Sequence, residues 1–574
     1  MKSVRFYTLG CKVNQYETAV MSELFSDKGY EVTNDYRDER ASGATPDVVV
    51  INTCAVTAES VRKSGQLIRR IRRANPEAIL AVVGCFSQIM PEDVENIEGI
   101  DIIMGVTNRG DIVNAVENVA RDVAASAASD TPGTADTVAT YDTGDIAAYT
   151  AGAANVQDAV AHIDAVHGSG AAVQATSTQS NKRRRRVYEE LNAIPLTNRT
   201  RAYVKIQDGC SQFCSYCIVP YIRGPMKSRK PDKTIHEAEA LIKKGYHEIV
   251  LTGIHISSFG NDSDDGTKLD DLILKISKID GLERLRLGSL EPTIITRRFM
   301  ENMKKCENVF CPHFHLSLQC GSNSVLKRMN RKYTTDEYIN SVNMIREFFP
   351  DAAMTTDIIV GFPGESEEEF SESFGFCKEV GFSKIHVFKY SPRKGTPAAT
   401  FDKQISSEIK TRRSESMVEL SKQMAYDFVK KYIGRNVSII VEKAYFSDIK
   451  CGIGAKFIIC EGLTPNYIHV RARLSPSEVI QNDKDFIDPS EGTRNDKDRL
   501  TMSEGTRNDK DYLTMSEGTQ NDKDRPIHTG GATVAGTGGA DSLIGATVAV
   551  IVDGCVADTL VGVCRINEPF LDRY

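Results

Sequence analysis

Residues 203–224 read YVKIQDGCSQFCSYCIVPYIRG and place three cysteines, Cys210, Cys214 and Cys217, directly after a strand-like run. Three thiolates at this spacing can bind one metal centre. A structural zinc ion needs four ligands, and the neighbourhood offers no fourth cysteine or histidine, since the next histidine is His236 in a helix-like segment. Three thiolates suit a [4Fe–4S] cluster that leaves one iron open for a substrate. We therefore interpret this loop as an iron–sulfur site, with zinc as the less favoured alternative.

The composition of the chain is typical of a globular protein, with 574 residues of which 41% are hydrophobic and 26% charged. A single core stops growing at about 250–300 residues, so we expect three folded units. No apolar run approaches the roughly 20 residues of a membrane span, and the start of the chain lacks the apolar core of a secretory signal. We expect a cytoplasmic protein with no membrane partner, whose 14 cysteines stay reduced.

A second cysteine set is spread over residues 1–120, where strand-like and helix-like segments alternate. The apolar runs VRFYTLG, DVVVINT and AILAVVG predict an open parallel α/β sheet. Cys11, Cys54 and Cys85 each follow the carboxyl end of one of these strands. Because these ends share one edge of the sheet, we expect the three thiols to converge there. Each thiol alone is better explained as an ordinary buried cysteine, but three equivalent positions favour a shared site.

Residues 196–432 repeat the alternation on a larger scale. The strand candidates are AYVKIQ, EIVLTG, RLRLGS, HFHLSLQ, MTTDIIVGF and KIHVFKY. Six strand–helix repeats predict a complete or partial (β/α) barrel. The first cysteine set follows the first strand, and therefore lies at the carboxyl edge, where such barrels carry their chemistry.

Residues 434–572 change to short β segments, which predict a small closing β-barrel. Two stretches lack the large apolar residues that a core needs, and we expect both to be disordered. Residues 121–190 form the first, rich in Ala, Thr, Gly and Ser, and residues of about 476–540 form the second, a polar 13-residue repeat typified by RNDKDRLTMSEGT. The second stretch interrupts the predicted β-barrel.

These residues carry a family resemblance that covers the chain except for the two insertions. The first cysteine set matches the radical S-adenosylmethionine (SAM) motif, and TLGCKVNQYE, INTCAVT and VVGC resemble the amino-terminal domain of methylthiotransferases. LTGIHISSFG, RLGSLEP, HFHLSLQCGSNSVLKRMNRKY, DIIVGFPGE and HVFKYSPRKGTPA continue the resemblance, and the closing β-barrel is similar to the TRAM RNA-binding domain. The chain departs from the family pattern at Cys320, where a serine is usual, and in the insertion within the β-barrel.

The resemblance implies two [4Fe–4S] clusters and SAM as cofactors. The cluster on Cys210, Cys214 and Cys217 would bind SAM and cleave it to a radical that activates C2 of a tRNA adenine. The auxiliary cluster on Cys11, Cys54 and Cys85 would supply sulfur, which a second SAM methylates. Gly361 and Gly364 of the GFPGE motif are candidate SAM-binding residues, with ordinary turn glycines as the alternative.

LGCKVNQYE is most similar to the MtaB type, which implies that the substrate is N6-threonylcarbamoyladenosine at position 37, in the anticodon loop of ANN-decoding tRNAs. Isopentenyladenosine-37 of tRNA and an aspartate of a ribosomal protein are the alternative substrates. A non-catalytic iron–sulfur electron carrier or RNA-binding protein is the alternative of another class.

The net charge of -7 does not itself favour RNA, but locally basic segments can still bind phosphate. The candidate phosphate contacts are Arg223, Lys227, Arg229 and Lys230, with the RRIRR run at residues 69–73. A solvated basic surface explains each of them equally well. The chemistry also implies an electron donor such as flavodoxin or ferredoxin.

Overall fold

The computed structural model describes most of the chain outside the expected insertions. The described residues are 2–33, 45–128, 139–141, 187–191, 193–195, 197, 199–263, 265–450, 456–474, 543–556 and 559–565. The repeat insertion at about 476–540 lies outside these residues, as does most of the 121–190 stretch. Of the latter, the end of one helix, the strand at 139–141 and residues 187–190 are described. None of the described helices has the length and apolarity to span a membrane.

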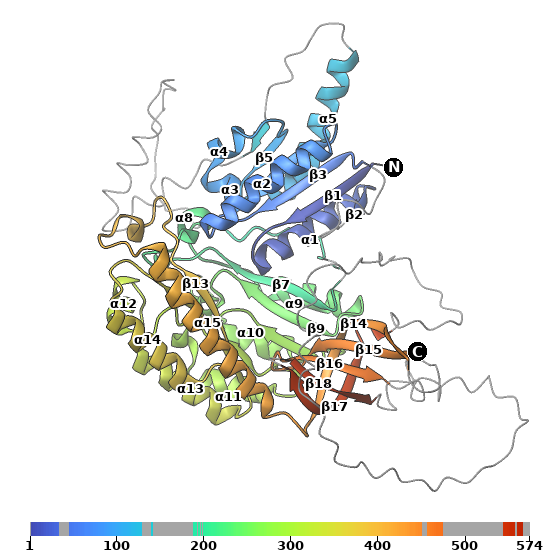
Figure 1. Ribbon diagram of the computed structural model, residues 1–574. Coiled ribbons are helices and arrows are strands. Elements are labelled where there is room, and N and C mark those ends of the chain that lie inside the picture. The colour runs from blue at the N-terminus through green and yellow to red at the C-terminus, as the bar shows by residue number, and fades with distance from the viewer. Residues whose placement is uncertain are drawn as a thin grey trace, which may run out of the picture.

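The amino-terminal part is an open parallel sheet, as predicted, with the strand order β2-β1-β3-β4-β5-β6 (Figure 1). Its strands are β1 (Ser3–Thr8), β2 (Glu31–Thr33), β3 (Val48–Thr53), β4 (Ile79–Gly84), β5 (Ile102–Met104) and β6 (Ala139–Tyr141). Its helices are α1 (Lys12–Asp27), α2 (Ala58–Ala74), α3 (Cys85–Ile89), α4 (Pro91–Glu95), η1 (Arg109–Asp111) and α5 (Ile112–Ala128).

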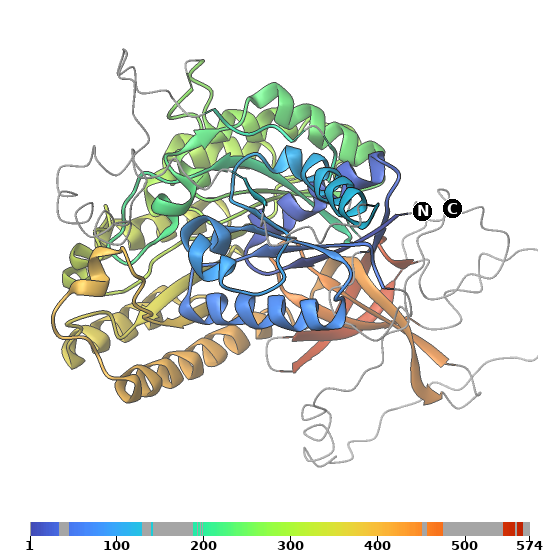
Figure 2. The same cartoon turned by 90° about the horizontal axis from the view of Figure 1, so that it is seen from above.

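Helices cover both faces of this sheet, as the view from above shows (Figure 2). All six residues of β3 are buried, which is the continuous apolar pattern of a central parallel strand. Val49 and Ile51 pack with α2, α3 and α4 on one face, while Val48 and Val50 pack with α1 and α5 on the other. The carboxyl ends of β1, β3 and β4 therefore share one edge.

The central part is a partial (β/α) barrel, and all six predicted strands are present. They are β7 (Arg201–Asp208), β9 (Glu248–Gly253), β10 (Arg284–Leu287), β11 (His313–His315), β12 (Ala353–Val360) and β13 (Lys384–Lys389), and the short β8 (Lys227–Ser228) pairs antiparallel with β7. Parallel pairing links neighbours in this order, with isolated bridges joining the β10 and β11 regions. Among the described residues no pairing joins β13 to β7, so the barrel is open on that side.

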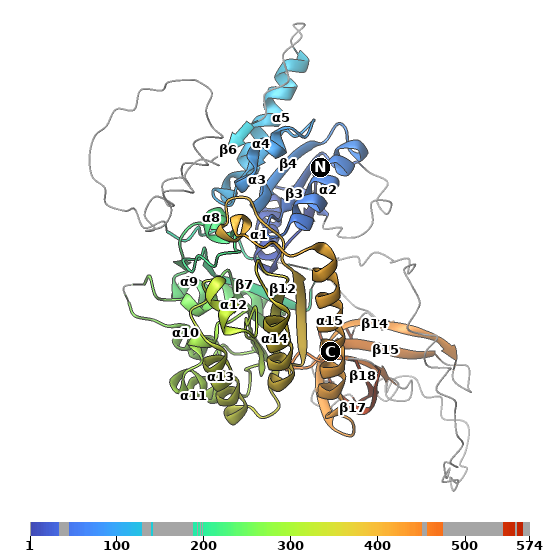
Figure 3. The ribbon, with the colours of Figure 1, turned by 60° about the vertical axis from the view of Figure 1, so that its left-hand side comes forward.

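Helices surround the outer face of this barrel (Figure 3). The helices of the central part are α8 (Val219–Arg223), α9 (Pro231–Lys243), η2 (Ile256–Ser258), α10 (Leu269–Ile276), η3 (Pro292–Ile294), α11 (Arg297–Lys305), α12 (Asn323–Arg328), α13 (Thr335–Phe348), α14 (Glu367–Val380), η4 (Pro397–Thr400) and α15 (Ser407–Lys430). Of these, α8 packs against α3 of the amino-terminal part instead. Local sequence fixes their ends. In α14, Ser366 and Glu369 form a capping box at the start, and Gly381 ends the helix in the left-handed conformation.

Helix α1 joins the first two parts because it packs between the amino-terminal sheet and the inner face of the barrel. Met21 and Phe25 contact the sheet, whereas Tyr16 and Val20 pack against Tyr203 of β7 and its neighbours. Residues that alternate with Tyr203 face the outer helices instead. Any polar side chain on this helix is thus enclosed from both sides.

The carboxyl-terminal part is a closed barrel with the order β14-β15-β16-β18-β17. Its strands are β14 (Asn436–Lys450), β15 (Lys456–Leu463), β16 (His469–Leu474), β17 (Thr547–Val556) and β18 (Thr559–Arg565). It docks at the amino ends of the central strands: Arg284 at the start of β10 donates to Leu463 O at 2.7 Å, and the Tyr467 ring stacks on His313 of β11 at 4.7 Å between centroids. It therefore lies opposite the cysteine loop.

Candidate functional site

The loop that carries the first cysteine set begins at the carboxyl end of β7. Gly209 is left-handed, with φ of 69°, and a Cβ here would lie 2.0 Å from the carbonyl oxygen of Pro225. The N–H of Cys210 then donates to the Gly224 carbonyl at 3.0 Å, so the chain returns to the start of the loop. Only glycine fits at the closure, because it has no side chain to displace the opposite backbone.

The three thiols of this loop are free and interact electrostatically. Cys214 is buried, while Cys210 and Cys217 are partly exposed. Burial raises the pKa of Cys210 to about 11 and that of Cys217 to about 12, and the Cys214 thiol adds to both shifts. Buried thiolates need a compensating positive charge, which a ligated iron cluster supplies. The donor set therefore fits such a group.

Charged side chains surround the first cysteine set at the carboxyl edge of the barrel. Arg331 donates to the Sγ of Cys214 at 3.2 Å and pairs with Glu291 at 2.9 Å. Glu291 follows β10 and also contacts His255 at 2.9 Å, beyond the end of β9. The edge thus brings a buried guanidinium and a buried carboxylate to the three thiols.

The second cysteine set converges at the carboxyl edge of the amino-terminal sheet, as the strand positions predict. Cys11 follows β1 and precedes α1, Cys54 follows β3, and Cys85 begins α3 after β4. A Cβ on Gly10 would lie 3.1 Å from the Cβ of Cys54, which places the first two cysteines side by side. The pKa of Cys85 is raised to about 12, mainly by burial; the Cys54 and Cys11 thiols contribute to this rise, so all three thiols are within electrostatic reach.

Neither set is arranged around a single ion. In the part of the chain that the structure describes, no group of three or more His, Cys, Asp or Glu side chains is placed to hold one metal ion in common. A [4Fe–4S] cluster makes a different demand, because each thiolate binds its own iron. Three free thiols at each site meet that demand in number and in chemistry.

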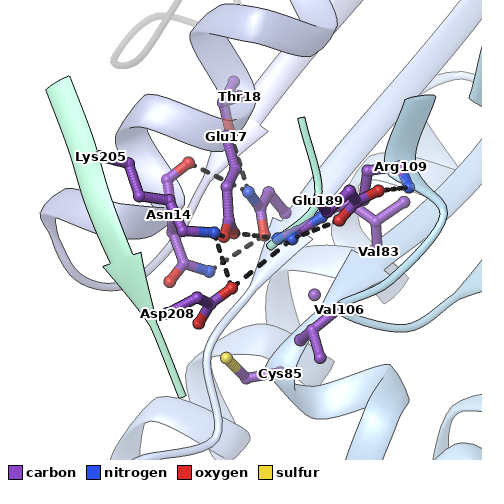
Figure 4. Close-up of polar contacts among 12 residues, drawn as sticks. Asn14, Glu17, Thr18, Val83, Cys85, Val106, Arg109, Glu189, Lys205 and Asp208 are labelled. Carbon is purple, nitrogen blue, oxygen red and sulfur yellow. Dashed lines mark hydrogen bonds and ion pairs between the residues drawn. The ribbon is translucent and has the colours of Figure 1, made fainter. Parts of the chain in front are cut away.

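A buried ion network joins the two sites, and Figure 4 shows its members pointing toward one another beside Cys85. Glu17 of α1 is fully buried and pairs with Arg109 at 2.5 Å, with Lys205 at 2.8 Å and with Arg223 at 2.8 Å. Asp208, at the end of β7, pairs with Lys205 at 2.7 Å and with Arg223 at 3.1 Å. Burial alone would raise the pKa of Glu17, but its three cationic neighbours hold that pKa well below the usual range.

The phosphate-binding prediction is wrong for three of the four residues that follow the first cysteine set. Arg223 is only 3% exposed and sits in the ion network. Lys227 is buried and donates to the carbonyl of Arg223 at 3.2 Å. Arg229 is buried and pairs with Glu190 at 2.8 Å and with Glu237 at 2.7 Å. Their charges are used inside the protein, where they compensate buried carboxylates.

Other predicted phosphate contacts do reach the surface. Lys230 is exposed, as are Arg69, Arg70 and Arg73 of α2. Arg72 is the exception in that run, because its guanidinium pairs with Asp101 at 2.6 Å. The three exposed arginines form a basic side of α2, while Lys230 directly precedes α9.

The two candidate SAM-binding glycines already use their backbone N–H groups within the protein. Gly361, with φ of 72°, donates to Glu365 Oε2 at 2.6 Å, and Gly364, with φ of 74°, donates to Lys403 O at 2.9 Å. These bonds favour the turn interpretation of both residues. Cys320 is fully buried in the barrel core, where a thiol packs as a small apolar group.

Comparison with known proteins identifies the family of the chain. The Radical SAM superfamily matches residues 204–377, and "Uncharacterized protein family UPF0004" matches residues 3–105. Threonylcarbamoyladenosine tRNA methylthiotransferase MtaB of Bacillus subtilis is 37% identical, over 78% of this chain and 86% of that protein. The chain belongs to the radical SAM methylthiotransferase family. The tRNA-2-methylthio-N(6)-dimethylallyladenosine synthase of Acetivibrio thermocellus is 33% identical, over 76% of this chain and 79% of that protein.

Each matched segment of this methylthiotransferase contains one cysteine set. Membership of the radical SAM superfamily implies a [4Fe–4S] cluster and SAM. Among solved structures, the radical SAM methyltransferase TsrM from Kitasatospora setae is similar, with a TM-score of 0.45 and 16% identity, over 70% of this chain and 77% of that chain.

The sequence prediction did not assign a role to Glu17, Arg109, Glu291 or Arg331. Three of these lie inside the motifs that carry the family resemblance, as the last residue of LGCKVNQYE, in RLGSLEP and in NRKY. Their position in those motifs was the available signal. Arg109 lies outside these motifs, so the sequence carried no signal for its role.

Proposed function

We propose that this chain transfers a methylthio group to C2 of N6-threonylcarbamoyladenosine at position 37 of tRNA, in the cytoplasm. One observation carries the proposal: two sets of three free thiols lie on the two sides of a single interface. Arg223 spans it, contacting both Asp208, which closely precedes Cys210, and the Sγ of Cys85 at 3.6 Å. Relatives named threonylcarbamoyladenosine tRNA methylthiotransferase MtaB, at 31% to 37% identity, support this choice of nucleoside.

In this proposal Cys210, Cys214 and Cys217 hold the cluster that binds SAM. Together the bound groups supply one-electron chemistry that activates an unreactive carbon–hydrogen bond. The chain positions them: Gly209 and Gly224 close the loop, and Arg331 supplies positive charge at Cys214.

Cys11, Cys54 and Cys85 hold a second, auxiliary cluster, the source of sulfur. Asn14 lies at this side of the site: its Nδ2 donates to Asn52 Oδ1 at 3.0 Å, and its Oδ1 lies 3.2 Å from Cys11 Sγ. Two clusters with open positions match two tasks, activation of C2 and delivery of sulfur to it. The short bridge through Arg223 supports their joint action on one base.

The tRNA anticodon loop presents a single-stranded adenine that an enzyme can extract and enclose. The exposed arginines of α2 and Lys230 are suited to its phosphates. On the closing β-barrel, Tyr445 and Phe446 of β14 are 41% and 50% exposed and offer surfaces on which bases stack. A flavodoxin or ferredoxin is the proposed electron donor.

Isopentenyladenosine-37 is the second candidate substrate, favoured by the 33% identity to a tRNA-2-methylthio-N(6)-dimethylallyladenosine synthase. The anaerobically reconstituted protein should be given dithionite, SAM and tRNA carrying either nucleoside, and the products read by nucleoside mass spectrometry. Methylthiolation of threonylcarbamoyladenosine alone supports the proposal, and exclusive methylthiolation of isopentenyladenosine would replace it.

The same reaction tests whether the protein is catalytic at all. The wild type should form 5′-deoxyadenosine from SAM, and a Cys214→Ala variant should form none. A Cys85→Ala variant is the matched control, because it removes one thiol of the other set. It should still cleave SAM but transfer no methylthio group. A fully loaded wild type that forms no 5′-deoxyadenosine would establish a non-catalytic iron–sulfur protein instead.

A further inference from the structure

Each cysteine set has a buried arginine that donates to one of its sulfurs. Arg223 Nη2 lies 3.6 Å from Cys85 Sγ, and Arg331 Nη1 lies 3.2 Å from Cys214 Sγ. Both arginines are at least nine-tenths buried, with side chains 2% and 7% exposed. The two sites therefore share one arrangement, built from unrelated parts of the chain.

Carboxylates hold each arginine in place. Arg223 Nη1 contacts Glu17 at 2.8 Å and Asp208 at 3.1 Å, while Nη2 contacts the second oxygen of Glu17 at 3.2 Å. This paired contact orients the planar guanidinium, so that Nη2 also reaches the sulfur. Glu291 makes a single ion pair with Arg331, from Oε1 to Nη2 at 2.9 Å. The hydrogen bonds to sulfur are thus set by the fold.

The charge balance around Arg223 leaves room for an anion. Its network contains three carboxylates, on Glu17, Asp208 and Glu189. Facing them are the cations of Arg109, Lys205 and Arg223, and Lys227 adds a fourth, since its ammonium contacts the Arg223 carbonyl. One positive charge is in excess. A thiolate at Cys85 would neutralise it.

A fixed positive charge next to a cluster ligand stabilises the more negative oxidation state of the cluster. Net charge, hydrogen bonds to the sulfurs and solvent exposure are the factors that set the potentials of iron–sulfur clusters. Reduction of [4Fe–4S]²⁺ to [4Fe–4S]⁺ consumes one electron, here from dithionite, and needs no proton. A guanidinium at the sulfur therefore makes reduction easier.

We propose that Arg223 is a positioning residue that raises the reduction potential of the auxiliary cluster, and that Arg331 does the same separately for the SAM-binding cluster. This inference rests on the proposed function, because it takes the auxiliary cluster as present. The predicted quantity is a potential, so it does not depend on which nucleoside is modified.

The test uses the full-length chain with Cys210, Cys214 and Cys217 replaced by alanine, which leaves the auxiliary cluster alone. Its potential is measured by anaerobic redox titration followed by electron paramagnetic resonance, without SAM or tRNA. Arg223→Gln should lower the equilibrium constant for reduction at least tenfold, about 59 mV for one electron. Arg331→Gln, the matched control, should leave this potential unchanged in the same background.

Both variants also have a reciprocal prediction. With Cys11, Cys54 and Cys85 replaced instead, Arg331→Gln should lower the remaining potential and Arg223→Gln should not. An unchanged potential in Arg223→Gln, or equal shifts from both arginine variants in one background, overturns the proposal.

A second variant covers the case in which Arg223→Gln does not load its cluster. Arg223→Lys keeps the charge but offers a single donor group, which cannot serve two carboxylates and a sulfur together. Because the charge stays and only the N–H contact to the sulfur is weakened, its equilibrium constant for reduction should fall by less than tenfold, and a fall of tenfold or more would overturn the proposed role of the charge. If the parent chain shows no auxiliary cluster signal, the proposed function loses its second cluster and this inference falls with it.

Discussion

Replacing Glu17 with glutamine should open the interface between the amino-terminal sheet and the barrel. Glu17 is fully buried and balances Arg109, Lys205 and Arg223. At an effective dielectric constant of about 20, unit charges about 4 Å apart attract by about 4 kcal/mol, so three pairs give roughly 12 kcal/mol before desolvation. Desolvation of each ion offsets several kcal/mol, and removal of one partner from a buried network costs about 3–5 kcal/mol.

Hydrogen–deuterium exchange of the α1 backbone amides in the full-length chain measures this cost as a free energy of local opening. A loss of 3–5 kcal/mol lowers the protection of these amides by roughly 10²- to 10⁴-fold. Glu59→Gln is the control, since Glu59 pairs with Arg62 on the exposed side of α2 in the same sheet domain, and it should change nothing measurable. A change below tenfold in Glu17→Gln would refute the reasoning.

The same network predicts an acid response. The folded pKa of Glu17 lies below its unfolded value of about 4.3. The stabilising effect of the Glu17 carboxylate is therefore complete above about pH 4.3 and is lost as pH falls toward the folded pKa. The difference in amide exchange between wild type and Glu17→Gln should be smaller at about pH 3 than at pH 7. Gly209→Ala should prevent closure of the loop against Pro225 and remove one cluster, so that reconstituted protein carries roughly four fewer iron atoms by elemental analysis. Tyr467→Ala removes a ring that stacks on His313, and should weaken docking of the closing β-barrel by about 1–2 kcal/mol, measured as faster exchange in β16.

The parallel sheet and the barrel could be predicted because their main strands are continuous apolar runs separated by helical periodicity. That pattern also gave the positions of Cys11, Cys54 and Cys85, since a parallel sheet fixes which strand ends share an edge. The strands β2, β5 and β6 were not predicted, because three residues are too few to show a pattern.

The roles of the basic residues could not be predicted, because a sequence shows charge but not burial. Arg223 and Lys230 lie in one basic stretch, yet only Lys230 is exposed. What separates them is the approach of Glu17, about 200 residues earlier in the chain, and no local pattern indicates a contact at that separation. The spacing of the first cysteine set, by contrast, is a local signal.

The closing β-barrel has a consequence for how the chain changes over evolutionary time. Its strands come from two stretches, with residues 475–546 between β16 and β17. If this connection is disordered, as its sequence predicts, the entropic cost of closing it grows only as (3/2)RT ln n, so one more 13-residue repeat would cost about 0.15 kcal/mol. Repeat number can therefore drift with almost no effect on the folding free energy of the barrel, and relatives with different copy numbers should fold equally well.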